Sequence, residues 1–143
     1  ELSNLNLTIS LFSKFDQMDI DTDILLIDSY GEASKFYNIS KCVLLGKSLM
    51  KSSTNNGGQN PIEPSRFGCK IFHGPNVSNF AEIYEYLKSL GVADQVNNPE
   101  ELNQSLDEEF NEDKSTNNQV VEKINNYGLN ILNNVILELK KYI

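Results

Sequence analysis

Short apolar runs alternate with polar turns and helical segments along most of this chain, and this alternation most constrains how it can fold. Residues 24–27, 42–45 and 70–73 have apolar centres and are too short for helices, so they are typical of strands buried on both faces. Each run ends in a polar turn with a glycine, and a helical segment follows. This order predicts an α/β fold with a mainly parallel, Rossmann-like sheet and helices on both faces.

The outer segments extend this pattern. Apolar residues at every second position predict a first strand at about 7–13, and a weak last strand is expected at 92–96. The direction of the first strand relative to the second is left open, because their connection is too short to hold a helix. Apolar periodicity and capping residues predict the helices, at residues 33–37, from near 61, at 79–90, at 98–110 and at 119–142.

Two of the expected helices begin with specific capping signals. Asn79 and Glu82 resemble a capping box, in which two side chains satisfy the free amides of the first turn. Asn98 precedes a proline and two acidic residues, which is the order expected of an N-cap, a first helical position and a first turn. The last helix is predicted to be long and amphipathic.

Composition bounds the function. The 143 residues suit one domain or one lobe of a larger protein, and the glutamate at position 1 leads us to expect a piece of a longer chain. A net charge of −8 argues against nucleic acid as a partner. No apolar run reaches the ~20 residues that span a bilayer, so we expect a soluble segment. Cys42 and Cys69 match no disulfide or metal pattern and are expected to be reduced core residues.

Polar turns at the carboxyl ends of neighbouring strands form the candidate site, because open α/β sheets bind ligands there. In residues 57–64, Gly57 and Gly58 allow positive φ and a close approach to a ligand, Pro61 suits a first helical turn, and Glu63 adds a carboxylate. This combination favours a charged, hydroxyl-bearing ligand, although an ordinary strand-to-helix connection has the same features.

Two further turns are open to more than one interpretation. Asp28 or Ser29 is expected to cap the following helix, either alone or together with a ligand contact. His73 lies at a strand end without the partners of a nucleophilic triad, so we expect a structural role or a place at the edge of the pocket.

Three motifs in the same order and spacing carry a family resemblance. Residues 28–32 (Asp-Ser-Tyr-Gly-Glu), 57–64 (Gly-Gly-Gln-Asn-Pro-Ile-Glu-Pro) and 74–82 resemble the donor-binding lobe of the 3-deoxy-D-manno-octulosonic acid (Kdo) transferases. The resemblance covers about residues 7–110. It implies the C-terminal half of a two-lobed GT-B glycosyltransferase, which transfers Kdo from CMP-Kdo to a lipid A precursor in lipopolysaccharide biosynthesis. It also implies that no metal or other cofactor is needed.

The resemblance assigns substrate-binding residues but no catalytic residue. The general base is expected in an N-terminal lobe outside this chain, so the fragment alone is expected to be inactive. The stronger candidates for binding CMP are Tyr30, Gly31, Glu32, Asn60, Pro61, Ile62 and Glu63. The weaker candidates are Ser29, Lys47, Gly57, Gly58 and Gln59.

The sequence departs from the family pattern at three places. Gln59 replaces a histidine, so it keeps hydrogen bonding but loses a titratable ring. Lys47 replaces a glycine and adds a cation near the expected phosphate, where it either assists the donor or points to solvent. The loop at 51–56 is also longer than the family pattern.

The resemblance further implies a domain plan, partners and a location. Residues 1–116 are expected to form the nucleotide-sugar-binding lobe, and residues 117–143 a helix that packs on, or crosses back to, the N-terminal lobe. The lipid acceptor and the membrane would be met only through the full-length protein, at the cytoplasmic face of the bacterial inner membrane. Apolar surface that the other lobe normally covers would allow self-association.

Two alternative functions are left open by the residues. One is the donor lobe of another GT-B glycosyltransferase that uses a UDP- or GDP-sugar. The other is a non-enzymatic, acidic α/β interaction module that binds a partner through its long terminal helix.

Overall fold

The computed structural model describes residues 6–17, 21–49, 57–112 and 118–142, which form two compact units. The first unit comprises Glu1–Phe36 and the second Tyr37–Ile143. Each unit contains its own parallel sheet. The loop at 51–56, predicted to be longer than in the family, lies outside the described residues. The boundary expected at residues 116 and 117 stays a prediction.

The first unit contains two parallel strands, β1 (Ile9–Leu11) and β2 (Ile24–Leu26), with the 3-10 helix η2 (Phe12–Gln17) between them. This settles the direction that the sequence left open. The prediction of a first strand reaching residue 13 is wrong, because the Ser13 amide donates to the Asp28 carboxylate at 2.9 Å and not to a neighbouring strand. Burial of the second strand on both faces is also wrong, since Leu26 is 52% exposed at the edge of a two-stranded sheet.

The second unit is built on three parallel strands in the order β3 (Cys42–Leu45), β4 (Lys70–His73) and β5 (Ala93–Gln95). All three were predicted, and the first two have the expected bounds, but burial of β3 on both faces is wrong because Leu44 is 42% exposed. The central strand β4 is the most buried, with Ile71 at 0% and Phe72 at 1% exposure. Apolar side chains from strands and helices complete the core around it, namely Leu45, Tyr84, Leu87, Ala93 and Ile124.

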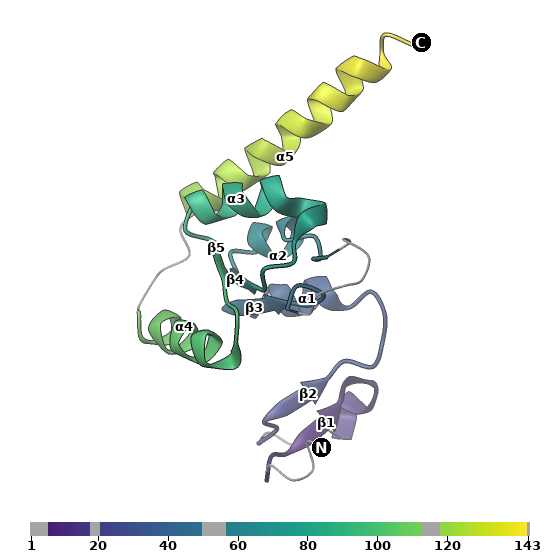
Figure 1. Ribbon diagram of the computed structural model, residues 1–143. Coiled ribbons are helices and arrows are strands. Elements are labelled where there is room, and N and C mark those ends of the chain that lie inside the picture. Colours follow the sequence, from purple (N-terminus) through teal and green to yellow (C-terminus); the bar gives the residue numbers. More distant parts are fainter. Residues whose placement is uncertain (1–5, 18–20, 50–56, 113–117, 143) are drawn as a thin grey trace. The chain divides into compact units, whose positions relative to one another are not determined.

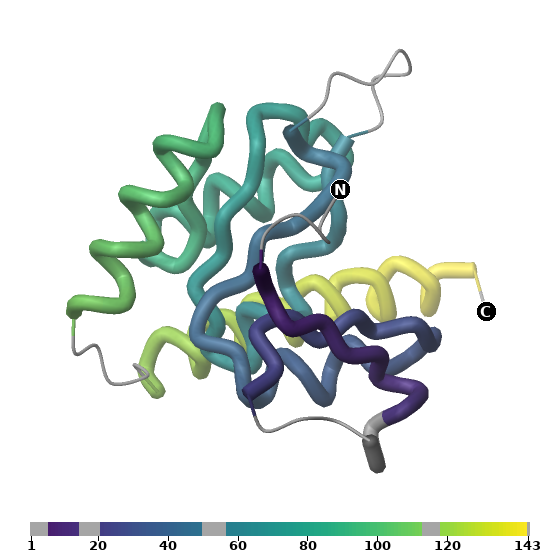
Figure 2. The backbone as a smooth tube through the Cα atoms, turned by 90° about the horizontal axis from the view of Figure 1, so that it is seen from below, coloured from purple at the N-terminus to yellow at the C-terminus, as the bar shows by residue number. Residues whose placement is uncertain are grey.

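Helices cover both faces of this sheet. Figures 1 and 2 show α4 (Pro99–Asn111) on one side of the three strands and α5 (Asn118–Leu139) on the other, with α3 (Ala81–Ser89) on the side of α5. The two remaining short helices of this unit are α2 (Ile62–Arg66) and the 3-10 helix η3 (Ser78–Phe80). The predicted α/β fold with a parallel sheet and a long last helix is therefore confirmed. The helix α1 (Ala33–Tyr37) also has its predicted bounds.

The two predicted helix caps have different outcomes. The Asn98 side chain accepts from the Glu101 amide at 2.8 Å, which confirms the N-cap of α4. The capping box at Asn79 and Glu82 is wrong, because α3 begins after Phe80 without a side-chain cap. The Asn79 amide instead donates to the Gly57 carbonyl at 3.4 Å, so this segment is tied to another loop.

The long helix α5 joins the core only at its start. Ile124 is 2% exposed, whereas the apolar side chains from residue 129 onward are exposed to 40% or more. Among the described ranges, none of the helices combines the length and the apolar character that a membrane span requires.

The two cysteines are free thiols. Cys69 is buried and donates to the carbonyls of Tyr37 and Ser40 at 3.2 and 3.3 Å, and Cys42 is partly covered within β3. Burial raises the pKa of both thiols, so both are protonated at neutral pH. The predicted core position is confirmed for Cys69, whereas Cys42 is only partly covered.

Candidate functional site

The loops that follow β3 and β4 are joined by one buried side chain, Ser48. Its hydroxyl donates to the Leu45 carbonyl at 2.6 Å and accepts from the Gly74 amide at 2.9 Å. Its carbonyl accepts from the backbone and side-chain amides of Asn76 at 2.9 and 3.1 Å. Because Ser48 is 0% exposed, water does not compete for these hydrogen bonds. They hold together the two loops at the carboxyl ends of β3 and β4.

The glycine pair lies against the same edge. Gly58 has φ +87° and donates its amide to the Lys47 carbonyl at 3.0 Å, so the expected positive φ is confirmed at this residue. A side chain at Gly57 would lie 2.4 Å from the Asn76 carbonyl oxygen. The close approach predicted for the pair is therefore made, at Gly57, to the backbone of the chain itself.

Of the next four candidates, the outer two, Asn60 and Glu63, are exposed, and the inner two are covered. Asn60 and Glu63 are exposed, whereas Pro61 is fully buried and precedes α2 as its N-cap residue. The Asn60 side chain accepts from the Ile62 amide at 3.0 Å, so the first free amide of this helix already has a partner. An exposed amide, an exposed carboxylate and a fixed backbone are thus available to a ligand.

Tyr84 holds the backbone of Gln59 through a hydrogen bond. Its hydroxyl donates to the Gln59 carbonyl at 2.9 Å, and burial raises the pKa of this phenol to about 12, so it remains a donor at any working pH. The Gln59 side chain itself is exposed and lies beside Gly46. Gln59 can therefore present its amide to a ligand while its backbone is held.

His73 is a structural residue of this edge. It is 4% exposed, its Nδ1 lies 2.7 Å from the Gly74 carbonyl oxygen, and its ring is 4.2 Å from that of Tyr84. Burial lowers the pKa of His73, so the ring is neutral at pH 7. These contacts agree with the structural role that the sequence favoured.

The lowered pKa of His73 makes the stability of the second unit depend on pH. The unfolded chain takes up a proton near the ordinary pKa of 6.5, whereas the folded chain resists it, so stability present above that pH is lost below it. We expect the free energy of unfolding to fall by about 1 kcal/mol from neutral pH to about pH 5, as measured by urea denaturation. The fall should shrink in His73→Gln; an equal fall in both proteins would assign it to other groups.

The first unit carries the remaining candidates. Tyr30 is fully exposed and Gly31 has φ +83°, while Glu32 forms an ion pair with Lys35 at 2.6 Å between Oε2 and Nζ. Ser29 is exposed as well. Asp28 does not act as the expected helix cap, because its carboxylate accepts from the amide and hydroxyl of Ser13. These hydrogen bonds lower the pKa of the Asp28 carboxyl.

The structure brings together the eight candidates of the second unit. Hydrogen bonds and backbone contacts at the edge of β3 and β4 involve Lys47, Gly57, Gly58, Gln59, Asn60, Pro61 and Ile62, and Glu63 follows directly in α2. The other four candidates, Ser29, Tyr30, Gly31 and Glu32, belong to the first unit. The single pocket expected to join both groups stays a prediction.

Sequence reasoning missed the residues that hold this edge together. Ser48, Asn76 and Tyr84 were not singled out as residues of the site. The available signal was their position: Ser48 and Asn76 each follow a strand within three residues of its end. A small hydroxyl or amide at such a position is a common means of satisfying turn backbone groups.

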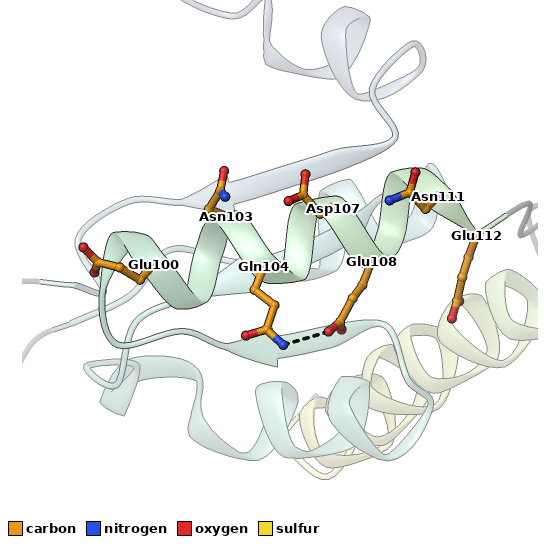
Figure 3. A pocket seen from close by; sticks show the side chains of 7 residues that line it. All are labelled: Glu100, Asn103, Gln104, Asp107, Glu108, Asn111 and Glu112. Carbon is orange, nitrogen blue, oxygen red and sulfur yellow. Dashed lines mark hydrogen bonds between the residues drawn. The ribbon is translucent and has the colours of Figure 1, made fainter.

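Two pockets of the second unit lie away from this edge. One, of about 500 Å³, follows α4 and is lined only by polar residues (Figure 3), namely Glu100, Asn103, Gln104, Asp107, Glu108, Asn111 and Glu112. Its four carboxylates oppose any anion. The other, of about 770 Å³, lies beside residues 41, 70 and 92, where the three strands begin. Neither suits a ligand bound at the carboxyl ends of the strands.

Comparison with known proteins identifies relatives that cover most of the chain. No protein-family model matches the chain. It is 31% identical over 113 residues to 3-deoxy-D-manno-octulosonic acid transferase from Haemophilus influenzae, covering 78% of this chain and 24% of that protein. The chain is a homologue of the Kdo transferases. The transferase of the same name from Aquifex aeolicus is 28% identical over 90 residues, covering 63% of this chain and 24% of that protein.

A solved structure shares the fold. The C-terminal CMP-Kdo binding domain of WaaA from Acinetobacter baumannii superposes with a TM-score of 0.71 at 24% identity, covering 87% of this chain and 62% of that one. The resemblance to Kdo transferases that the three motifs predicted is thus confirmed. The chain spans about a quarter of the length of the curated Kdo transferases that it matches, at 24% in both cases above.

Proposed function

We propose that this chain is the CMP-Kdo binding lobe of a glycosyltransferase that transfers Kdo to a lipid A precursor in lipopolysaccharide biosynthesis. The observation that carries the proposal is the similarity, over 78% of the chain, to a protein named Kdo transferase. The likeness in fold to a CMP-Kdo binding domain supports the assignment to donor binding. The lobe alone is expected to be inactive, because the general base is expected elsewhere in the full-length enzyme.

Different candidate residues are proposed to bind different parts of the donor. Exposed Glu63 suits the ribose hydroxyls, because a carboxylate is a strong acceptor and would repel a phosphate. Asn60 and Gln59 offer amides for a sugar or a cytosine edge. In the first unit, the backbone amides that follow Gly31 are assigned to the CMP phosphate, and Tyr30 and Glu32 are assigned to other parts of CMP. No metal or other cofactor enters this scheme.

The acceptor and the location follow from the same proposal. The lipid A precursor would bind the other lobe of the full-length enzyme, at the cytoplasmic face of the inner membrane. This lobe would then stabilise CMP as it leaves when an acceptor hydroxyl attacks the anomeric carbon of Kdo.

A titration with CMP tests the donor assignment. We expect CMP to perturb the backbone NMR signals of Gly31, Glu32, Asn60 and Glu63, and UMP and ADP to do so much less. Glu63→Gln should weaken CMP binding roughly tenfold, because a charged acceptor for hydroxyl donors is lost. The matched control is Glu85→Gln, which removes an exposed carboxylate from α3 and should leave the affinity unchanged.

The outcomes separate the proposal from its alternatives. Binding of UMP or a guanine nucleotide in preference to CMP would contradict the Kdo assignment and favour another sugar-nucleotide transferase. The absence of any nucleotide binding would favour an interaction module.

We also expect self-association through the exposed apolar face of α5. Leu129, Leu132 and Leu139 are 54%, 53% and 57% exposed, which is unusual for a packed helix. Sedimentation velocity should therefore show an average mass that rises with protein concentration. The double variant Leu132→Glu, Val135→Glu should remain monomeric, whereas a wild-type chain that stays monomeric at high concentration would contradict the prediction.

A further inference from the structure

A positive group would stabilise an anion bound at the carboxyl ends of β3 and β4, and most of the described candidates there do not supply one. The helix α2 has five residues, and Asn60 already accepts from its first free amide at 3.0 Å. His73 is kept neutral because burial lowers its pKa. Glu63 adds a negative charge. Among the described loop residues, a positive charge therefore has to come from another side chain.

Lys47 has the one cationic side chain among the described loop residues of this edge, which are 46–49, 57–61 and 74–77. Its side chain is exposed, and none of the ion pairs found among residues 37–49, 57–112 and 118–142 involves its ammonium group. The chain as a whole has a net charge of −8, so a cation at this point stands out against an acidic background.

The backbone of Lys47 is held in an unusual conformation. Its φ of +57° is in the left-handed region, which favours glycine and is disfavoured for a lysine. Two neighbours fix it: the Gly58 amide donates to the Lys47 carbonyl at 3.0 Å, and the next residue is the buried Ser48. The lysine is therefore placed directly beside the glycine pair, in a conformation that glycine would adopt more easily.

We propose that Lys47 binds the phosphate of the nucleotide donor. The inference rests on the proposed function and extends it, by adding a side-chain cation to the groups proposed to bind the donor. An ammonium group acts on phosphate as a compact point charge with three donors. Binding of a nucleoside monophosphate should then weaken with added salt, whereas binding of the nucleoside should not.

Calorimetric titration of the whole chain tests this with CMP, cytidine, UMP and inorganic phosphate. Lys47→Gly removes the charge and suits the left-handed backbone, so it should fold at least as stably as the wild type. We expect it to bind CMP on the order of tenfold more weakly and cytidine unchanged. Lys47→Arg keeps the charge and should retain most of the affinity. Lys88→Gln removes a lysine from α3 and should change nothing.

Each outcome bears on the inference separately from the proposed function. Equal CMP affinity in the wild type and Lys47→Gly would overturn the role of Lys47 and leave CMP binding intact. An equal loss for CMP and cytidine would also overturn it, because the effect would not depend on phosphate. If UMP and phosphate bind as tightly as CMP and depend on Lys47, the inference is supported and the CMP assignment is overturned. If the wild type binds none of these ligands, both are overturned.

Discussion

Replacing Gly74 with alanine is expected to destabilise the second unit severely. A methyl group at this position would lie 2.3 Å from the Ser48 carbonyl oxygen, 2.5 Å from its carbonyl carbon and 2.6 Å from the Leu49 Cα. All three are backbone atoms, so rotation of a side chain does not relieve the contact. Overpacking of a filled interior costs about 1–3 kcal/mol, and here a whole loop must move, so we expect a loss of at least about 3 kcal/mol.

Gly128→Ala is the matched control for this substitution. Gly128 lies within α5, and no atom would come within 4 Å of an added Cβ. Alanine is the better helix former, so the control should gain about 0.5–1 kcal/mol. Urea denaturation followed by circular dichroism measures both changes. A loss of less than about 1 kcal/mol in Gly74→Ala would show that the loop after β3 yields easily, contrary to the expectation.

Replacing Ser48 with alanine should have the second largest effect, about 2–3 kcal/mol. The hydroxyl is donor to the Leu45 carbonyl and acceptor from the Gly74 amide, at 2.6 and 2.9 Å, and the residue is fully buried. Alanine leaves both backbone groups without this partner in a place that water does not reach. The cost of leaving a buried polar group unpaired, rather than the net worth of one hydrogen bond, sets the magnitude.

Ser89→Ala provides the comparison for Ser48→Ala. The Ser89 hydroxyl also donates to a backbone carbonyl, that of Tyr86 at 2.7 Å, but it lies at the exposed end of α3. Water replaces that bond, so we expect a change within about 0.5 kcal/mol. Equal effects of the two substitutions on the urea midpoint would contradict the role assigned to buried Ser48. Where the proposed function holds, Ser48→Ala should also weaken CMP binding, because the loops it joins carry the ligand groups.

The elements that local sequence predicted well are those whose limits are set within a few residues. The strands β3 and β4 have the predicted bounds because each is a short apolar run closed by a glycine. Asn98 caps α4 as expected, since the bond from the Glu101 amide spans three residues. Gly58 has the predicted positive φ for the same local reason. Features that depend only on residues a few positions apart can be recognised from the sequence alone.

The errors arise where a distant partner competes with the local pattern. The first strand ends early because Ser13 is held by Asp28, fifteen residues away. The capping box at Asn79 does not form because the Asn79 amide donates to the Gly57 carbonyl. In both cases a contact absent from the local window takes the donor that the predicted element needed.

The candidate site shows the same division. The three motifs in residues 28–32, 57–64 and 74–82 together predicted the relationship to Kdo transferases, and the comparisons confirmed it. The means by which these motifs meet were not visible in the sequence, because Ser48 binds Gly74 across 26 residues. Gly57 was assigned to a close approach to a ligand, and its neighbour is the backbone of Asn76.

The amino-acid sequence by itself determined the order of strands and helices, the parallel α/β architecture and the family relationship, because each depends on periodicity, capping or short motifs. Only the tertiary structure decided which groups at the strand ends remain available to a ligand. Ser48, Asn76 and Tyr84 use their polar atoms on the backbone, whereas the side chains of Lys47 and Glu63 remain exposed. The physical reason is that a buried polar group must find a partner, and that partner is chosen by the fold.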